Sequence, residues 1–212
     1  MSKRGFFISL EGVEGVGKST AFTYMQDYLV DRNINLAVTR EPGGTDIAER
    51  IRKVLLDHHA EQMFIDTEVL LMFASRAQNI SQIIRPALQK GDWVLADRYV
   101  DASFAYQGYG RDVAMDRMQQ ISNWVINGLL PDITILLDAP VEVGLQRMIA
   151  RGKKDRIEQE GVDFFERVRN GYLQLASDDP GRYRVIDATK SIENVQNEIK
   201  SILDNLIAMV NI

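Results

Sequence analysis

FFISLEGVEGVGKST, residues 6–20, is the stretch that decides the fold of this chain. An apolar run, residues 6–10, leads into a glycine-containing segment, and a helix-like pattern follows. Residues 12–19 match G-x-x-x-x-G-K-[ST], the pattern of a loop whose backbone N–H groups surround phosphate oxygens. The helix that follows such a loop adds its positive N-terminal end. The stretch therefore predicts a strand, a phosphate-binding loop and a helix.

Two side chains of this loop have specific expected roles. Lys18 would bridge the terminal phosphates of a bound compound, and the Ser19 hydroxyl would take one place on an octahedral Mg²⁺ ion. We expect the following loop residues to contact the phosphate compound: Gly12, Val13, Glu14, Gly15, Val16, Gly17, Lys18, Ser19 and Thr20. A chance match in a glycine-containing turn is the alternative, and the strand before and helix after the motif argue against it.

Length and composition restrict the class of protein. With 212 residues, 45% of them hydrophobic, the chain is long enough for one α/β domain and short for two. The net charge of −5 argues against a nucleic-acid-binding surface as the main purpose. Without cysteine there is no sign of a disulfide-stapled secreted fold, and no apolar run approaches the roughly 20 residues of a membrane helix. We read no signal peptide at the N-terminus and expect a cytoplasmic protein.

Short apolar runs alternate with long segments of helical apolar spacing along the whole chain. The five runs are residues 6–10, 36–39, 93–96, 133–137 and 184–186. Their hydrophobicity is continuous rather than alternating, which indicates strands buried on both faces. The pattern predicts an α/β fold with a five-stranded parallel sheet flanked by helices on both faces. In such sheets ligands bind beyond the carboxyl ends of the strands.

Asp97 and Arg98 directly follow the third run, at the position where ligands are expected. An aspartate at the end of a hydrophobic strand is placed to hold magnesium directly or through water. Arg98 can bind a phosphate group with two parallel hydrogen bonds. The alternative is that the two residues pair with each other or cap the next helix.

Residues 67–88 have a long helical pattern that brings Phe73 and Arg76 to neighbouring positions. An aromatic ring and a guanidinium fork three residues apart can approach one planar base together. Met72 is expected to be a packing residue. The segment 101–108 offers hydroxyl and amide groups that could bind a sugar or a base edge, although an ordinary helix ending in glycine fits its composition equally well.

Glu14 is unexpected inside an anion-binding loop. It is either a solvated surface glutamate or an acceptor for a hydroxyl group of a second substrate. The loop also lacks an arginine to neutralise a transferred phosphoryl group. A basic run after the fourth strand could supply it, with Arg151 and Arg156 brought over the phosphoryl group by a mobile flap. The alternative for this run is a solvated charged face.

Together these motifs resemble those of bacterial thymidylate kinases, which are nucleoside monophosphate kinases. The resemblance extends over nearly the whole chain. Its motifs are EGVEGVGKST (11–20), TREPGGT (39–45), FASRAQ (73–78), DRYVDASFAYQG (97–108), NGLLPD (127–132) and ARGKKDRIE (150–158). The resemblance implies a single kinase domain over residues 1–212, with the P-loop NTP hydrolase fold and a lid at approximately 150–160. It also implies ATP-dependent phosphorylation of dTMP to dTDP with Mg²⁺, and a homodimer.

The resemblance also implies roles for individual residues. Glu14 is similar to a loop carboxylate near the dTMP 3′-hydroxyl, Arg98 to a dTMP phosphate ligand and Arg76 to an arginine that binds thymine. Arg151 and Arg156 are similar to lid arginines. On this basis the expected catalytic residues are Lys18, Arg98, Arg151 and Arg156, and the expected metal ligands are Ser19 and Asp97. The expected dTMP-binding residues are Glu14, Phe73, Arg76, Arg98, Ser103, Tyr106 and Gln107.

The chain departs from the family pattern at the aromatic platform. The stacking phenylalanine commonly lies four residues before the base-binding arginine, where this chain has Met72, so either Phe73 or Met72 could cover the base. Two other functions are compatible with the loop: a kinase for another nucleoside monophosphate, or a nucleotide switch. No N/T-K-x-D sequence follows a predicted strand, which weakens the switch alternative.

Overall fold

Five apolar runs pair into one parallel sheet in the computed structural model, which describes residues 4–151 and 155–210. The strands are β1 (Phe7–Glu11), β2 (Leu36–Arg40), β3 (Trp93–Asp97), β4 (Ile133–Asp138) and β5 (Tyr183–Asp187). Each begins and ends within one residue of its predicted bounds. The predicted parallel sheet is therefore confirmed.

The strand order is β2-β3-β1-β4-β5, with β1 in the centre. Ile8 of β1 lies beside Leu95 of β3 on one side and Ile133 of β4 on the other. From β1 the chain builds the β2 and β3 side first, and then crosses to add β4 and β5. This change of direction beside β1 creates the crevice in which open α/β sheets bind ligands. The phosphate loop follows β1 directly.

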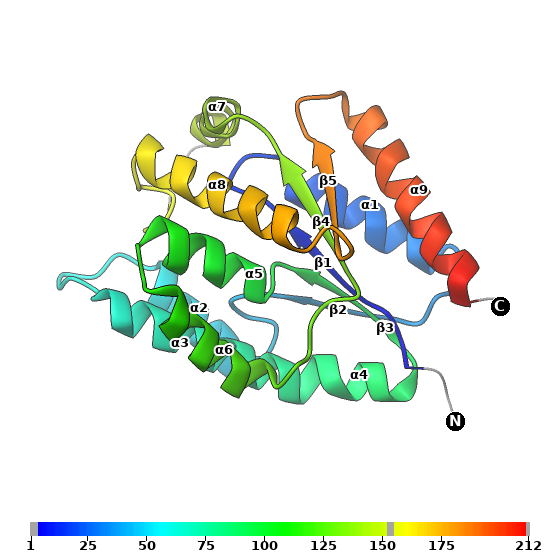
Figure 1. Ribbon diagram of the computed structural model, residues 1–212, viewed down its shortest axis with the longest axis horizontal. Helices are drawn as coiled ribbons and strands as arrows, with labels where there is room; N and C mark the ends of the chain where they lie inside the picture. The colour runs from blue at the N-terminus through cyan, green and yellow to red at the C-terminus, as the bar shows by residue number, and fades with distance from the viewer. Residues whose placement is uncertain (1–3, 152–154, 211–212) are drawn as a thin grey trace.

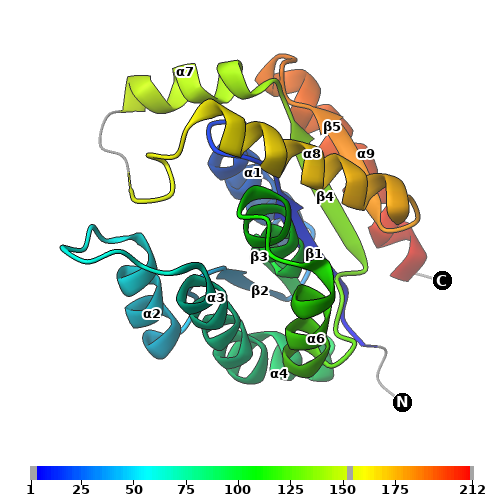
Figure 2. The ribbon, with the colours of Figure 1, turned by 60° about the vertical axis from the view of Figure 1, so that its left-hand side comes forward.

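Helices cover both faces of the sheet, as predicted (Figures 1 and 2). The helices are α1 (Lys18–Val30), α2 (Asp46–Leu56), α3 (Ile65–Asn79), α4 (Arg85–Lys90), α5 (Val100–Ser103), α6 (Met115–Ile126), α7 (Val141–Arg151), α8 (Val162–Asp178) and α9 (Ile192–Val210). Two π-helical segments, η1 (Ile80–Ile84) and η2 (Phe104–Gly110), continue α3 and α5. In Figure 2, α1 and α9 lie behind the sheet, and α8 lies in front of it.

Alternate side chains of β1 enter two separate hydrophobic clusters. Ile8 and Leu10 pack in the cluster that contains Leu29 of α1 and Leu203 of α9. Phe7 packs in the cluster that contains Phe73 of α3. A strand with core on both faces needs continuous hydrophobicity, which is the pattern that its sequence has.

The predicted helical segment 67–88 forms a nearly unbroken run through α3, η1 and α4. Segment 101–108 is also helical, and its helix ends at Gly110 rather than Gly108. Over residues 4–151 and 155–210, no helix is long and apolar enough to cross a membrane.

Candidate active site

The phosphate loop connects β1 to the first residue of α1. Gly12, Gly15 and Gly17 have φ angles of 141°, 74° and 100°, in the left-handed region that favours glycine. A Cβ atom at Gly15 would lie 2.1 Å from the carbonyl oxygen of Gly144 in α7. The loop therefore needs glycine for its turns and for its close contact with α7.

Lys18 begins α1, and its ammonium group folds back over the loop. Its Nζ donates to the carbonyl oxygens of Gly12 at 2.9 Å and Val13 at 2.8 Å. Burial, and then repulsion from the Arg98 guanidinium, lowers the pKa of Lys18 to about 8. Phosphate oxygens would favour the charged form again, because a nearby negative charge raises the pKa of an amine. The ammonium group is thus held where the loop would receive an anion.

The other loop side chains divide into a buried and an exposed set. Val13 and Val16 belong to the hydrophobic core, so they contribute packing rather than charge. Ser19 and Thr20 are exposed and line the crevice beside Lys18. This division agrees with the expected shortage of positive charge in the loop itself.

Three adjoining cavities form one crevice at the carboxyl end of the sheet. The central cavity, about 310 Å³, is lined by the loop and by Asp97 and Arg98. It shares Gly17, Thr20 and Arg147 with an apolar cavity of about 250 Å³. On its other side it continues into a narrow cavity of about 80 Å³, which we call the acceptor cavity. The arrangement offers space for two ligands that meet at the loop.

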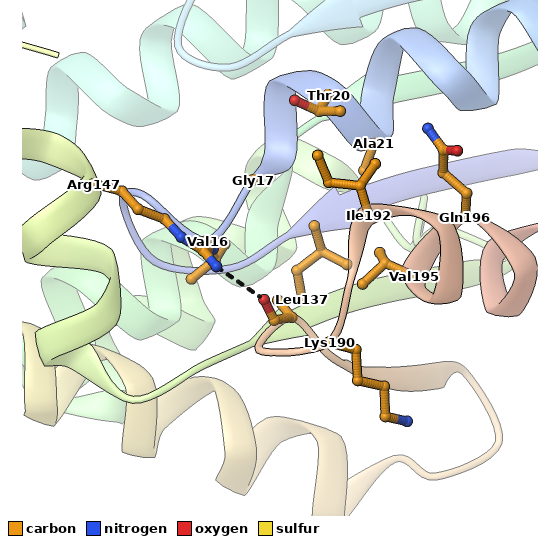
Figure 3. Close-up of a pocket in the computed structure, with 11 residues that line it drawn as sticks. Val16, Gly17, Thr20, Ala21, Leu137, Arg147, Lys190, Ile192, Val195 and Gln196 are labelled. Atoms are coloured by element: carbon orange, nitrogen blue, oxygen red, sulfur yellow. Dashed lines mark hydrogen bonds between the residues drawn. The ribbon is translucent and has the colours of Figure 1, made fainter. Parts of the chain in front are cut away.

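The apolar cavity lies between α1 and α9 (Figure 3). Ala21 of α1 and Ile192 and Val195 of α9 form its walls. Arg147 of α7 extends along it, with its Nη2 3.5 Å from the carbonyl oxygen of Ala188 and its Nη1 3.4 Å from that of Gly15. A flat apolar group attached to phosphates in the loop would fit beside this guanidinium.

Asp97 and Ser19 present hard oxygen ligands to the central cavity. The Oδ1 atom of Asp97 is buried and has no hydrogen-bond partner in the described part of the chain. Across residues 4–151 and 155–210, no three His, Cys, Asp or Glu side chains gather as a metal site. Mg²⁺ commonly takes one or two protein oxygens and completes its shell with water and substrate phosphates. Asp97 and Ser19 fit that type of site.

Arg98 joins the phosphate loop to the acceptor cavity. Its backbone has a left-handed φ of 69°. Its Nη2 donates to Glu14 Oε1 and to the Tyr106 hydroxyl, both at 2.8 Å, and its Nη1 donates to the Tyr172 hydroxyl at 2.9 Å. The Tyr106 hydroxyl also donates to Glu14 Oε2. The sequence predicted Glu14, Arg98 and Tyr106 as one site, and the structure brings them together.

Glu11 contacts two residues next to the Arg98 cluster, Tyr172 and Tyr99, and the sequence did not predict this role. Its carboxylate accepts hydrogen bonds from the Tyr172 hydroxyl and the Tyr99 backbone N–H, both at 2.7 Å. Burial, and then repulsion from Asp101, raises the pKa of Glu11 to about 8. Glu11 therefore positions Tyr172, which in turn contacts Arg98.

Arg76 is completely buried and has a partner at every nitrogen. Its Nε donates to Glu41 Oε2 at 2.6 Å, its Nη1 to Ser103 Oγ at 2.9 Å and its Nη2 to the Tyr99 carbonyl oxygen at 3.0 Å. Burial raises the pKa of Glu41, although Arg76 opposes the shift. Glu41 thus fixes the direction of the guanidinium, and Ser103 is in its expected place beside it.

Of the two candidates for the base platform, Met72 lines the acceptor cavity. Phe73 is 1% exposed and packs in the core, where its ring lies 4.9 Å from the Arg76 guanidinium carbon. The two side chains point in different directions because one helical residue is about 100° of rotation. Phe73 therefore contacts Arg76 from the core side, whereas Met72 faces the acceptor cavity.

Gln107, another expected dTMP-binding residue, is 1% exposed. Its Nε2 donates to Glu68 at 2.9 Å, whereas its Oε1 has no hydrogen-bond partner in the described part of the chain.

Arg156 lies on the acceptor side of the crevice. Its Nη2 donates to Glu68 at 2.6 Å and its Nε to the Leu55 carbonyl oxygen at 2.8 Å. It does not line the cavity around Lys18. The side chain of Arg151, its expected partner over the phosphoryl group, lies outside the described residues. Both assignments stay predictions.

Arg52 lines both the central and the acceptor cavities and was not predicted. Its Nη1 donates to the Pro42 carbonyl oxygen at 2.7 Å. Burial, and then Arg40, lowers its pKa. A lone arginine in an amphipathic helix reads as a surface residue, and only the fold turns this one toward Arg98.

Comparisons with known proteins agree with this geometry. The thymidylate kinase family model matches residues 10–199. A thymidylate kinase from Ruthia magnifica subsp. Calyptogena magnifica is 49% identical over 204 residues, covering 96% of this chain and all 100% of the relative. A thymidylate kinase from Ectopseudomonas mendocina (strain ymp) is 52% identical over 203 residues, which cover 96% of this chain and 97% of the relative. The crystal structure of thymidylate kinase from Ehrlichia chaffeensis matches with a TM-score of 0.76 at 30% identity, covering 94% of this chain and 99% of that one. The chain therefore belongs to the thymidylate kinase family.

Proposed function

We propose that this protein transfers the γ-phosphoryl group of ATP to dTMP, forming dTDP and ADP for deoxythymidine nucleotide synthesis. The observation that carries the proposal is the contact of Glu14 and Arg98, which joins the phosphate loop to the acceptor cavity. A loop that only binds or hydrolyses a nucleotide has no need of such a contact. A kinase needs this contact, because it must bring the phosphates of two nucleotides together.

ATP would bind with its phosphates in the loop and its base in the apolar cavity between α1 and α9. Arg147 lines both the apolar and the central cavity, so it can contact the base and the phosphates of one bound nucleotide. Asp97 and Ser19 would hold Mg²⁺, which neutralises charge on the phosphates when it is bound.

The dTMP phosphate would bind to Arg98 and replace its contact with Glu14, which is then free to accept a sugar hydroxyl. Arg76, Ser103 and Gln107 would lie along the base. A dTMP phosphate oxygen attacks the γ-phosphorus of ATP, a new P–O bond forms, and the bond to the bridging oxygen breaks to release ADP. Lys18 and Arg98 would stabilise the charge that spreads over the transferred group.

Arg151 and Arg156 would complete that stabilisation from a lid at approximately 150–160. For this role Arg156 must exchange its contact with Glu68 for one with the phosphoryl group. We further propose that the chain works in the cytoplasm as one kinase domain.

An acceptor panel tests the proposed function. ADP release from Mg²⁺-ATP should depend on dTMP and be weaker with dUMP, CMP, AMP and GMP. Equal rates across the panel would favour a kinase with another specificity. ADP release that no acceptor stimulates would instead favour a nucleotide switch.

We also propose that two copies of the chain form a homodimer. A groove of about 430 Å³ between α3 and α6 is lined by Leu70 and Trp124, which are 59% and 82% exposed. Exposed apolar groups of this size that lie together favour a partner surface. A second copy burying the same helices would make a closed, two-fold interface.

A further inference from the structure

Glu68 is a buried carboxylate outside the proposed catalytic contacts, and it lies on α3 with only 2% of its surface exposed. Three side chains donate to it: Gln107 at 2.9 Å, Arg156 at 2.6 Å and Arg111 at 3.3 Å. Burial acts to raise the pKa of Glu68, but Arg111 and the other donors hold it below its usual value. Glu68 therefore stays ionised, and its negative charge attracts the three donors Gln107, Arg156 and Arg111.

The Arg156 contact positions one wall of the acceptor cavity. Asp155 and Ile157, on either side of Arg156, both line that cavity. The backbone N–H of Arg156 also donates to the Leu56 carbonyl oxygen at 3.2 Å, and Leu56 lines the cavity as well. The ion pair with Glu68 is one side-chain contact that holds this turn, residues 155–160, against α3.

The Arg111 contact secures the far end of the same turn. Arg111 Nη1 donates to Glu160 Oε1, and its guanidinium carbon lies 4.7 Å from the centre of the Phe164 ring in α8. Glu68 thus reaches the turn at two points, through Arg156 and through Arg111.

The Gln107 contact fixes the direction of an amide. An ionised carboxylate can only accept hydrogen bonds, so Glu68 must face the NH₂ group of Gln107. The Oε1 atom of Gln107 then remains as an acceptor, which is buried and has no partner within the described residues. Gln107 follows Tyr106, which binds Arg98 and Glu14.

We propose that Glu68 is a positioning residue for the acceptor nucleotide. It holds the turn 155–160 and the Gln107 amide in place while dTMP binds, before Arg156 exchanges this contact for one with the phosphoryl group, and it does not touch dTMP. This inference rests on the proposed function. It assigns Glu68 to the acceptor side alone. Tyr106, Asp155 and Ile157, which adjoin its partners Gln107 and Arg156 in the chain, line the acceptor cavity. Neither Glu68 nor its partners line the apolar cavity between α1 and α9.

The test is Glu68→Gln, which keeps the size of the side chain and removes its charge. Hydrogen bonds to charged groups contribute enough that we expect the KM for dTMP to rise about tenfold or more. The KM for ATP should stay within about twofold. Calorimetric binding of dTMP without ATP should weaken by the same factor. Glu68→Asp, which keeps the charge, should recover part of the loss.

Asp27→Asn is the matched control, because it removes an exposed carboxylate from α1. It should leave both KM values unchanged. Glu160→Gln breaks only the Arg111 link and should raise the KM for dTMP by a smaller factor, which keeps the inference testable if Glu68→Gln does not fold.

The outcomes separate the two proposals. If Glu68→Gln lowers stability but leaves dTMP binding unchanged, or raises both KM values equally, Glu68 has only a structural role. If the unaltered protein binds dTMP but transfers no phosphoryl group to it, the proposed function fails, and the calorimetric comparison still tests Glu68. If it does not bind dTMP at all, both proposals fall.

Discussion

At the scale of single residues, the site is built from charges that already have partners. Arg98 is held by Glu14, Tyr106 and Tyr172, and Arg76 by Glu41. Such contacts keep the guanidinium groups aimed before a nucleotide arrives, which lowers the cost of ordering them on binding.

Lys18 gives a prediction about pH. Its charged form is the one that binds phosphate, and its pKa in the free protein is lowered to about 8. We therefore expect kcat/KM for ATP to be full below that pH and to fall as pH rises through it. Lys18→Arg, although less active, should keep its profile flat there because arginine stays charged. A profile of the unaltered protein that is flat to pH 10 would contradict the role of Lys18.

Met72 and Phe73 give a paired prediction. Met72→Ala should raise the KM for dTMP about tenfold, because it removes apolar surface that would cover the base. Phe73→Leu should instead cost about 1 kcal/mol of unfolding free energy with little change in KM, because Phe73 packs in the core. Steady-state kinetics and urea unfolding of both variants distinguish the two roles. The reverse pattern would show that Phe73 is the platform.

These residue assignments mark the limit of prediction from sequence. Glu14 and Arg98 were expected close together because they follow neighbouring strands, and Tyr106 was added to them by the resemblance to the family. The choice between Met72 and Phe73 was not decided, because both are apolar and adjacent, and only the rotation of α3 separates them. Glu11 and Glu68 were missed because a carboxylate in a sequence normally indicates a surface, and their partners lie far away along the chain.

At the scale of elements, the phosphate loop depends on α7 as much as on its own glycines. Gly15 and Gly144 touch through their backbones, and a Cβ atom on Gly144 would lie 2.4 Å from the Glu14 carbonyl oxygen. The bounds of the five strands followed from their apolar runs. The π-helical segments could not be predicted from the sequence, since the extra residue in each turn leaves no signature in apolar spacing.

Gly144→Ala tests this contact. The added methyl group should push the loop away from α7, lower the unfolding free energy by about 1–3 kcal/mol and raise the KM for ATP. Gly181→Ala is the control, because Gly181 is exposed and a Cβ there meets nothing nearer than Asp179 Oδ1 at 3.8 Å. It should change stability by less than about 0.5 kcal/mol. Equal effects of the two substitutions would mean that the loop does not rely on α7.

At the scale of the whole molecule, the sheet brings two ligand spaces to either side of one loop. The crossover beside β1 places α1, α7 and α9 around the donor side and α2, α3 and η2 around the acceptor side. The class of fold could be predicted because continuous apolar strands alternate with helices. The proposed partner surface could not be predicted, because the exposed side chains of α3 and α6 come together only in the folded chain.

Trp124→Glu tests the homodimer. A buried charge without a partner is costly, so this variant should be monomeric where the unaltered protein is dimeric. Light scattering after size-exclusion chromatography measures the difference. Trp124→Phe should remain dimeric. An unaltered protein that is monomeric at micromolar concentration would contradict the proposal.

Phosphoryl transfer to dTMP is measured most directly by following the phosphoryl group itself. The protein would be incubated with Mg²⁺, dTMP and ATP labelled at the γ-phosphate, and the nucleotides would be separated. Label should appear in the β-phosphate of dTDP in amounts equal to the ADP formed, and Lys18→Ala should lower this transfer at least about a hundredfold. Label found only in free phosphate, or unchanged transfer by Lys18→Ala, would contradict the proposed function.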